Sequence, residues 1–272
     1  MKTRIIAGAG IIAVLLAVLI FAPQCIAALF IGVVCAGASY ELLWGIGLVK
    51  NVRLNIYSAA MAFGVALWSY FGCSYAVALV AVLVYSGLLF MELMASKLQL
   101  PAKDVFVCLA SGLLIPFLLS ALVRIGAMPQ GKLLLVIPFV MAFMSDTGAY
   151  FIGVTMGKHK MAPMISPKKS WEGFVGGILA AIIGMVLYGV VAEKFFAMQV
   201  NYGVLLIYGL LGSLGGVFGD LTMSVIKRQV GVKDYGNLIP GHGGILDRFD
   251  SVLITAPLTE ALLILLPIMV NV

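Results

Sequence analysis

Charged residues are scarce in this sequence, at 10% of its 272 residues, whereas soluble domains carry about 25%. Hydrophobic residues make up 63% of the chain, and its mean hydropathy is +1.15. So few charges cannot cover the surface of a soluble globular protein of this length, and intrinsic disorder requires the opposite composition. The composition therefore excludes both classes and indicates a multi-pass membrane protein.

Cysteine is also scarce, and its placement excludes further classes of protein. The four cysteines lie in or beside apolar stretches without a C-x-x-C pair, which speaks against a disulfide framework or a zinc site. The sequence has no G-x-S-x-G or H-E-x-x-H motif, so common hydrolase and zinc-protease sites have no support. The net charge of +6 is typical of basic cytoplasmic loops, and we expect no nucleic-acid partner.

Nine apolar stretches of about 18–21 residues follow one another along the chain, and each is long enough to cross roughly 30 Å of hydrocarbon as a helix. None of them shows the ten-residue alternation of a membrane β-barrel. We therefore predict an all-α polytopic integral membrane protein with about nine transmembrane helices, the first one retained rather than cleaved as a signal peptide. The predicted spans are 5–22, 25–45, 54–72, 75–95, 105–123, 133–153, 174–192, 203–223 and 250–270.

The basic residues orient these predicted helices. With a cytoplasmic N-terminus, 14 of the 17 Lys and Arg residues fall in inside segments and 3 fall outside, which is a strong positive-inside bias. An odd number of spans then places the C-terminus outside. We expect a multi-pass protein of the cell inner (cytoplasmic) membrane, with N-terminal helices over 1–130 (about five spans) and catalytic helices over 131–272. The cytoplasmic loops 154–173 and 224–249 are long and polar, which favours a functional role.

Four aspartates lie at a similar depth near the predicted cytoplasmic face. Asp146 and Asp220 are inside the sixth and eighth spans, while Asp247 and Asp250 open the ninth. Charges inside a membrane span are costly, so each is a functional candidate. A lone aspartate there often makes only a hydrogen bond between helices, but several at one depth favour a metal-dependent site. Carboxylate oxygens suit Mg²⁺, which proteins usually hold with one or two carboxylates plus substrate phosphates.

Helical spacing and glycine-rich loops place other groups near these acids. Asp220, Ser224 and Lys227 are spaced i, i+4, i+7 and share one stripe of the eighth helix. Successive glycines before Asp247 can form an anion-binding nest. The loop 166–173 adds two lysines and a serine that suit phosphate. Together these features favour phosphoryl or nucleotidyl transfer at the membrane surface, although lipid headgroups alone would also explain each basic loop.

Glycine is abundant in the C-terminal half of the chain, where it suits close helix packing. The glycines with this expected role are Gly176, Gly177, Gly212, Gly215, Gly216 and Gly219.

The segment from Ser224 to Asp250 holds a long pattern of charged residues, glycine and proline. Its members are Ser224, Lys227, Arg228, Lys233, Asp234, Pro240, His242, Gly243, Gly244, Asp247, Arg248 and Asp250. This pattern resembles the signature of the phosphatidate cytidylyltransferase (CDP-diglyceride synthetase) family. The segments 145–150 and 166–173 are similar to that family as well, so the resemblance covers roughly 140–255.

The resemblance implies that CTP and phosphatidic acid react to give CDP-diacylglycerol and pyrophosphate, as in phospholipid biosynthesis. It also implies Mg²⁺ dependence and a homodimer in the membrane lipid. On this basis we assign Asp220 and Asp247 as principal metal ligands, helped by Asp146 and Asp250. The expected substrate-binding residues are Lys168, Lys169, Ser170, Ser224, Lys227 and Arg228 for phosphates, His242, Gly243 and Gly244 for the nucleotide triphosphate, and Arg248 for the phosphatidate headgroup.

Two other classes of protein stay open at this point. A secondary transporter with an acidic ion pathway would place charges near the midplane, accessible from both sides, whereas the acids here lie at one face. A non-catalytic lipid-binding or scaffold protein would leave the cost of clustered acids unexplained.

Overall fold

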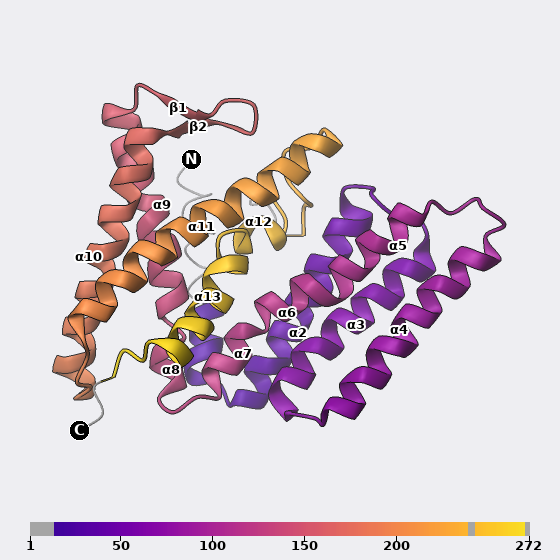
Figure 1. Ribbon diagram of the computed structural model, residues 1–272, viewed down its shortest axis with the longest axis horizontal. Helices are drawn as coiled ribbons and strands as arrows, with labels where there is room; N and C mark the ends of the chain where they lie inside the picture. Colours follow the sequence, from indigo (N-terminus) through magenta and orange to yellow (C-terminus); the bar gives the residue numbers. More distant parts are fainter. Residues whose placement is uncertain (1–13, 239–242, 270–272) are drawn as a thin grey trace. The chain divides into compact units, whose positions relative to one another are not determined.

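The computed structural model describes residues 14–238 and 243–269 (Figure 1). The named secondary-structure elements among these residues are helices and one short β-hairpin. The chain divides into two compact units, which are treated separately below. Unit 1 consists of Met1–Pro129 and Val230–Phe249, and unit 2 of Gln130–Gln229 and Asp250–Val272.

Unit 1 is built around helices that follow the predicted apolar stretches. Asn51 begins one of them, because its side-chain oxygen accepts the backbone N–H groups of Arg53 and Leu54 at 2.9 and 3.4 Å. Gly72 ends the same helix in the left-handed conformation. The elements are α2 (Gln24–Tyr40), η1 (Glu41–Gly45), α3 (Val52–Phe71), α4 (Tyr75–Ala95), α5 (Ala102–Leu109), η2 (Ala110–Leu114), α6 (Ile115–Leu119), α7 (Ala121–Gly126) and α12 (Leu246–Phe249).

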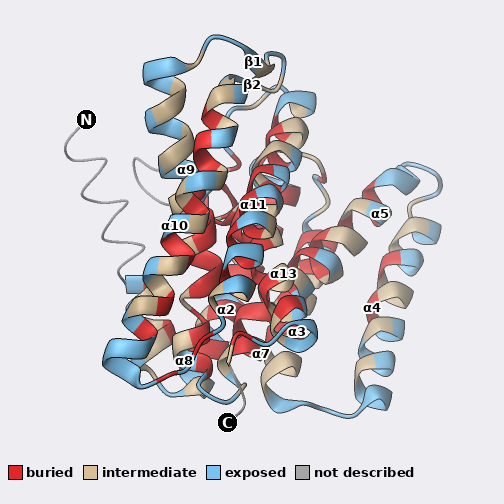
Figure 2. Cartoon of the chain, turned by 60° about the vertical axis from the view of Figure 1, so that its left-hand side comes forward, coloured by how far each residue is buried: buried red, intermediate tan, exposed pale blue. Residues whose placement is uncertain are grey.

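Hydrogen bonds between buried hydroxyl groups join the helices of unit 1. Ser39 of α2 meets Ser111 of η2 at 2.6 Å, and Ser58 of α3 meets Tyr85 of α4 at 2.9 Å. The Tyr85 hydroxyl donates onward to the Cys108 carbonyl at 2.6 Å. Helix α4 is otherwise largely exposed along its length (Figure 2), as suits a helix whose apolar side chains face lipid.

Unit 2 holds the longest helices and packs them through glycine. A Cβ atom on Gly177 of α10 would lie 2.8 Å from the Ser145 carbonyl oxygen of α9, and one on Gly212 of α11 would collide with the Met141 side chain of α9. The expected close helix approach is therefore confirmed for this part of the chain. The elements are α8 (Gly131–Leu134), α9 (Ile137–Met156), β1 (Lys160–Ala162), β2 (Ser166–Ser170), α10 (Trp171–Phe196), α11 (Tyr202–Val230) and α13 (Val252–Leu265).

The hairpin of β1 and β2 lies within the segment 154–173 that we expected to be a loop. Its strands are antiparallel, with Lys160 opposite Ser170 and Ala162 opposite Ser166. The sequence gives little sign of it, since the strands are short and polar. Its backbone pairing nevertheless fixes the lysine-bearing strand directly before α10.

Seven helical segments among the described residues are long and apolar enough to span a membrane, so the chain is a multi-pass membrane protein. The prediction of an all-α membrane fold is confirmed apart from the hairpin. The apolar helix Val252–Leu265 is shorter, and residues 5–13 of the first predicted span lie outside the described residues. The count of nine and the orientation of the termini therefore stay predictions. The seven segments are Gln24–Gly45, Val52–Phe71, Tyr75–Ala95, Ala102–Gly126, Gly131–Met156, Trp171–Phe196 and Tyr202–Val230.

Candidate active site

A cavity of about 170 Å³ opens in unit 2 where the hairpin meets helices α9, α10 and α11. It combines acidic, basic and apolar side chains, which is the mixed lining expected of a site that orients a charged ligand. Its lining residues are Asp146, Ala149, Tyr150, Met161, Lys168, Lys169, Ser170, Gly173, Phe174 and Val217.

An ion pair links the hairpin to helix α11 beside this cavity. The Lys169 Nζ lies 2.5 Å from Asp220 Oδ2, and the two side chains are 21% and 23% exposed. Lys169 is held in place because the next residue, Ser170, caps α10 by accepting the Gly173 N–H at 3.2 Å. The junction of β2 and α10 thus places the Lys169 side chain against Asp220 of helix α11.

Three carboxylates gather around this ion pair. Asp146, Asp220 and Asp250 lie close enough for their charges to repel one another, and the charges of Lys169 and Lys227 offset that repulsion. Holding three negative charges together lowers the stability of the protein. Their presence here therefore favours a function that uses negative charge.

Hydroxyl groups hold two of these carboxylates. The Ser224 hydroxyl donates to Asp220 Oδ1 at 3.3 Å, in keeping with the helical stripe expected from their spacing. The Ser251 hydroxyl donates to Asp146 Oδ2 at 3.4 Å. Gly219 permits the close approach of the next segment, since a Cβ atom there would lie 2.6 Å from the Asp250 carbonyl oxygen.

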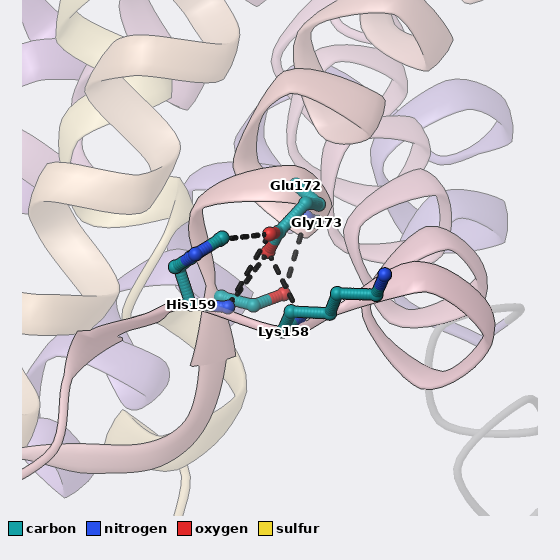
Figure 3. Close-up of polar contacts among 5 residues, drawn as sticks. Lys158, His159, Glu172 and Gly173 are labelled. Atoms are coloured by element: carbon teal, nitrogen blue, oxygen red, sulfur yellow. Dashed lines mark hydrogen bonds and ion pairs between the residues drawn. The ribbon is translucent and has the colours of Figure 1, made fainter.

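Glu172 fastens the hairpin to the start of α10, as Figure 3 shows. Its carboxylate accepts the backbone N–H groups of Lys158 and His159 at 3.2 and 3.3 Å, and it meets the His159 ring Nδ1 at 2.6 Å. An acidic side chain in the first turn also suits the positive end of a helix dipole. Glu172 therefore joins the start of α10 to Lys158 and His159, the residues just before the hairpin.

Asp247 belongs to unit 1, in the short helix α12. Its Oδ2 accepts the backbone N–H groups of Tyr235 and Gly244 at 2.8 and 2.9 Å, and the residue is 7% exposed. Gly243 has a φ of +83°, a conformation that glycine adopts without strain. Gly243 and Gly244 thus shape a turn in which the Gly244 N–H donates to the Asp247 carboxylate.

The remaining predicted residues fall in three groups. Lys168 and Arg228 are exposed in unit 2, and Arg228 Nε donates to the Ile165 carbonyl of the hairpin at 3.2 Å. Arg248 is exposed in unit 1. His242 lies outside the described residues, so its predicted role is untested. Unit 2 thus brings together Asp146, Asp220, Asp250, Lys168, Lys169, Ser170, Ser224 and Lys227, while Gly243, Gly244, Asp247 and Arg248 lie in unit 1.

The chemistry of these groups fits a hard divalent cation. Within residues 14–238 and 243–269, no set of three or more His, Cys, Asp or Glu side chains is arranged to hold a metal ion. Mg²⁺ requires fewer, because it keeps waters and takes further oxygens from substrate phosphates. Asp146, Asp220 and Asp250 carry oxygen donors of the kind that Mg²⁺ takes, and the assignment of metal ligands stays a prediction.

Two carboxylates with clear structural roles were not predicted as site residues. Glu172 lies in the segment 166–173 that resembles the family, and Glu41 lies in the second predicted span. The position of Glu41 inside an apolar span was the available signal. Its partners, Ile245 and Leu246, lie more than 200 residues away in the sequence, and sequence spacing cannot reveal them.

Comparison with known proteins gives the family of the chain. The model described as "Cytidylyltransferase family" matches residues 2–266. A Staphylococcus epidermidis protein named phosphatidate cytidylyltransferase is 46% identical over 135 residues, which are 50% of each chain. A Staphylococcus aureus protein of that name is 48% identical over 128 residues, 46% of this chain and 47% of the relative. The chain spans about half the length of the curated relatives it matches. Because the family model covers nearly the whole sequence, the chain belongs to the cytidylyltransferase family.

Proposed function

We propose that this protein transfers CMP from CTP to phosphatidic acid, giving CDP-diacylglycerol and pyrophosphate. The observation that carries the proposal is the cavity at the start of α10, which Lys168, Lys169 and Asp146 line together. In a cytidylyltransferase-family chain, such a mixture of cations and carboxylates suits phosphate groups that need to be held against their mutual repulsion. Relatives named phosphatidate cytidylyltransferase supply the choice of substrates.

In this reaction the main task of the protein is to position two anions, CTP and phosphatidate. A phosphatidate phosphate oxygen forms a bond to the α-phosphorus of CTP, while the bond from that phosphorus to the oxygen bridging the β-phosphorus breaks. Pyrophosphate leaves with the electron pair of the broken bond. A phosphate monoester is already largely ionised near pH 7, so no strong general base is needed. Orientation and charge neutralisation then supply most of the rate enhancement.

Particular residues have particular roles in this proposal. Lys168, Lys169 and Arg228 hold phosphate oxygens from the hairpin side, and Lys227 holds them from α11. His242, Gly243 and Gly244 cradle the nucleotide triphosphate, and Arg248 holds the phosphatidate headgroup.

We assign Asp220 and Asp247 as principal Mg²⁺ ligands, with Asp146 and Asp250 as helpers. When bound, Mg²⁺ neutralises charge on the phosphates. The Lys169–Asp220 ion pair keeps both groups in place before substrate arrives, and each then exchanges its partner for a ligand of opposite charge.

The cellular setting belongs to the same proposal. CTP is cytosolic, so the site faces the cytoplasm from a bacterial inner membrane, and the N-terminus is inside and the C-terminus outside across nine spans. The positive-inside distribution of Lys and Arg supports this orientation. A homodimer is the expected assembly, and its support is the resemblance to the family.

The test is a mixed-micelle assay with purified protein, phosphatidate and CTP labelled in its α-phosphate. Label should enter the lipid fraction with release of pyrophosphate, and EDTA should stop both. Diacylglycerol without the phosphate is the control acceptor. If diacylglycerol served equally well, the proposed nucleophile would be wrong, and ion or solute flux in vesicles without any lipid labelling would favour the transporter class.

A further inference from the structure

Glu41 is a fully buried carboxylate at the end of helix α2, with an exposed fraction of 0%. It is the first residue of the π-helical turn η1. Turns of this kind are rare within α-helices and often accompany functional sites. A charge buried at this depth is expensive unless each oxygen is well paired.

Both oxygens of Glu41 are paired with the loop that carries Asp247. The Ile245 N–H donates to Oε1 at 2.8 Å and the Leu246 N–H donates to Oε2 at 2.9 Å. One carboxylate therefore binds two successive amides directly before Asp247. These amides begin the short helix α12, where they lack partners within the helix.

Glycine makes room for this carboxylate on two sides. A Cβ atom on Gly236 would lie 3.0 Å from Glu41 Oε1, and one on Gly244 would collide with Oε2. Gly244 also donates its N–H to Asp247. The same short loop thus accommodates Glu41 on one side and binds the Asp247 carboxylate on the other.

Glu41 and Asp247 are close enough for their charges to repel one another. An apolar pair of similar size would fill this space without that cost. Glu41 therefore contributes more than packing: it fixes the backbone from which the Asp247 side chain projects.

We propose that Glu41 is a positioning residue for Asp247, through which the N-terminal helices set the geometry of the metal-binding carboxylate. This inference rests on the proposed function, because it takes Asp247 as a Mg²⁺ ligand of a nucleotidyl transfer site. It gives helix α2 a role in the reaction that its apolar sequence does not suggest.

The test compares Glu41→Gln with wild type in the CMP-transfer assay across a range of Mg²⁺ concentrations. Glutamine keeps the size of the side chain but has only one acceptor oxygen, so it releases one of the two amides. We expect turnover to fall at least about 10-fold with the KM for phosphatidate unchanged. The Kd of the purified protein for Mg²⁺, measured by titration without substrates, should rise at least about 3-fold. Glu92→Gln is the matched control, since Glu92 makes an ion pair with the exposed Arg53 at 3.2 Å and should keep wild-type values.

A double-mutant cycle with Asp247→Glu separates positioning from general support of the fold. Asp247→Glu already displaces the carboxylate by one methylene, so adding Glu41→Gln should cost less than about 3-fold more. Multiplicative losses, or lower turnover with an unchanged Kd for Mg²⁺, would overturn the proposal. If Glu41→Gln does not fold, Glu41→Asp replaces it, and if neither folds the residue serves the fold and the proposal is wrong. Wild-type activity in the same assay tests the proposed function separately.

Discussion

The two partners of the Lys169–Asp220 ion pair should contribute unequally to the stability of the protein. Lys169→Met deletes a cation and leaves Asp146, Asp220 and Asp250 repelling one another. Asp220→Asn deletes one of these three acids, and Lys169 keeps the nearby charge of Asp146. The first change should therefore destabilise the protein, whereas the second should leave its stability equal or slightly higher.

The burial of the pair sets the magnitude of this difference. Removing one partner of a fully buried pair costs about 3–5 kcal/mol, whereas exposed pairs contribute about 0–1 kcal/mol. Both side chains here are about one-fifth exposed, so we expect Lys169→Met to cost roughly 1–3 kcal/mol of unfolding free energy. Asp220→Asn should change it by less than about 0.5 kcal/mol.

Turnover should respond differently from stability. Each variant removes a charge assigned to the transferring phosphates or to their metal, so each should lower CMP transfer at least about 100-fold, or roughly 3 kcal/mol. The double variant should regain stability but not activity. The measurements are thermal unfolding in detergent and CMP transfer at saturating Mg²⁺. Equal destabilisation by both variants would refute the electrostatic reasoning, and folded variants with near-normal turnover would remove both residues from the site.

Three further outcomes are expected. Asp247→Asn should lower turnover at least about 100-fold in the labelled-CTP assay, while the control Glu92→Gln stays near wild type. If Asp247→Asn is folded and active, Asp247 is not a metal ligand. Glu172→Gln should loosen the hairpin and raise the KM for CTP about 3- to 10-fold with a smaller change in kcat, and an unchanged KM would show that the contact in Figure 3 does not position the lysines. A reporter that is active only outside the cytoplasm should be active after Val272 and silent within 224–249, and the reverse pattern would exclude the proposed topology.

Composition was enough to predict the membrane class and the helices, because lipid leaves the backbone few ways to satisfy its hydrogen bonds. Helix ends were harder to predict. Helix α9 continues to Met156 and α11 to Val230, beyond the predicted spans, since the hydrogen bonds of a helix do not depend on hydropathy and continue until a residue breaks them. The hairpin was missed because β1 and β2 are stabilised by backbone pairing and by Glu172, and neither leaves a periodic pattern.

The candidate site was predictable only where its residues are close in sequence. The stripe from Asp220 to Ser224 followed from helical spacing and is confirmed as a hydrogen bond. The ion pair of Lys169 with Asp220 joins residues about 50 positions apart, and the contact of Glu41 with Ile245 joins residues much further apart. Long-range pairs of this kind depend on the fold, which one sequence does not reveal.

The membership of residues 230–249 in unit 1 has a consequence for the order in which the protein can form. The ribosome delivers Glu41 to the membrane early and its two amide donors near the end of synthesis, after all of helix α11. Until then the carboxylate has no Ile245 or Leu246 to bind, and the N-terminal helices lack a part of their own unit. N-terminal domains commonly complete their folding early in synthesis, but unit 1 needs residues 230–249, which are made after most of unit 2. The last step in completing unit 1 is therefore the arrival of the segment that carries Asp247, and without it the Glu41 carboxylate lacks its two amide donors.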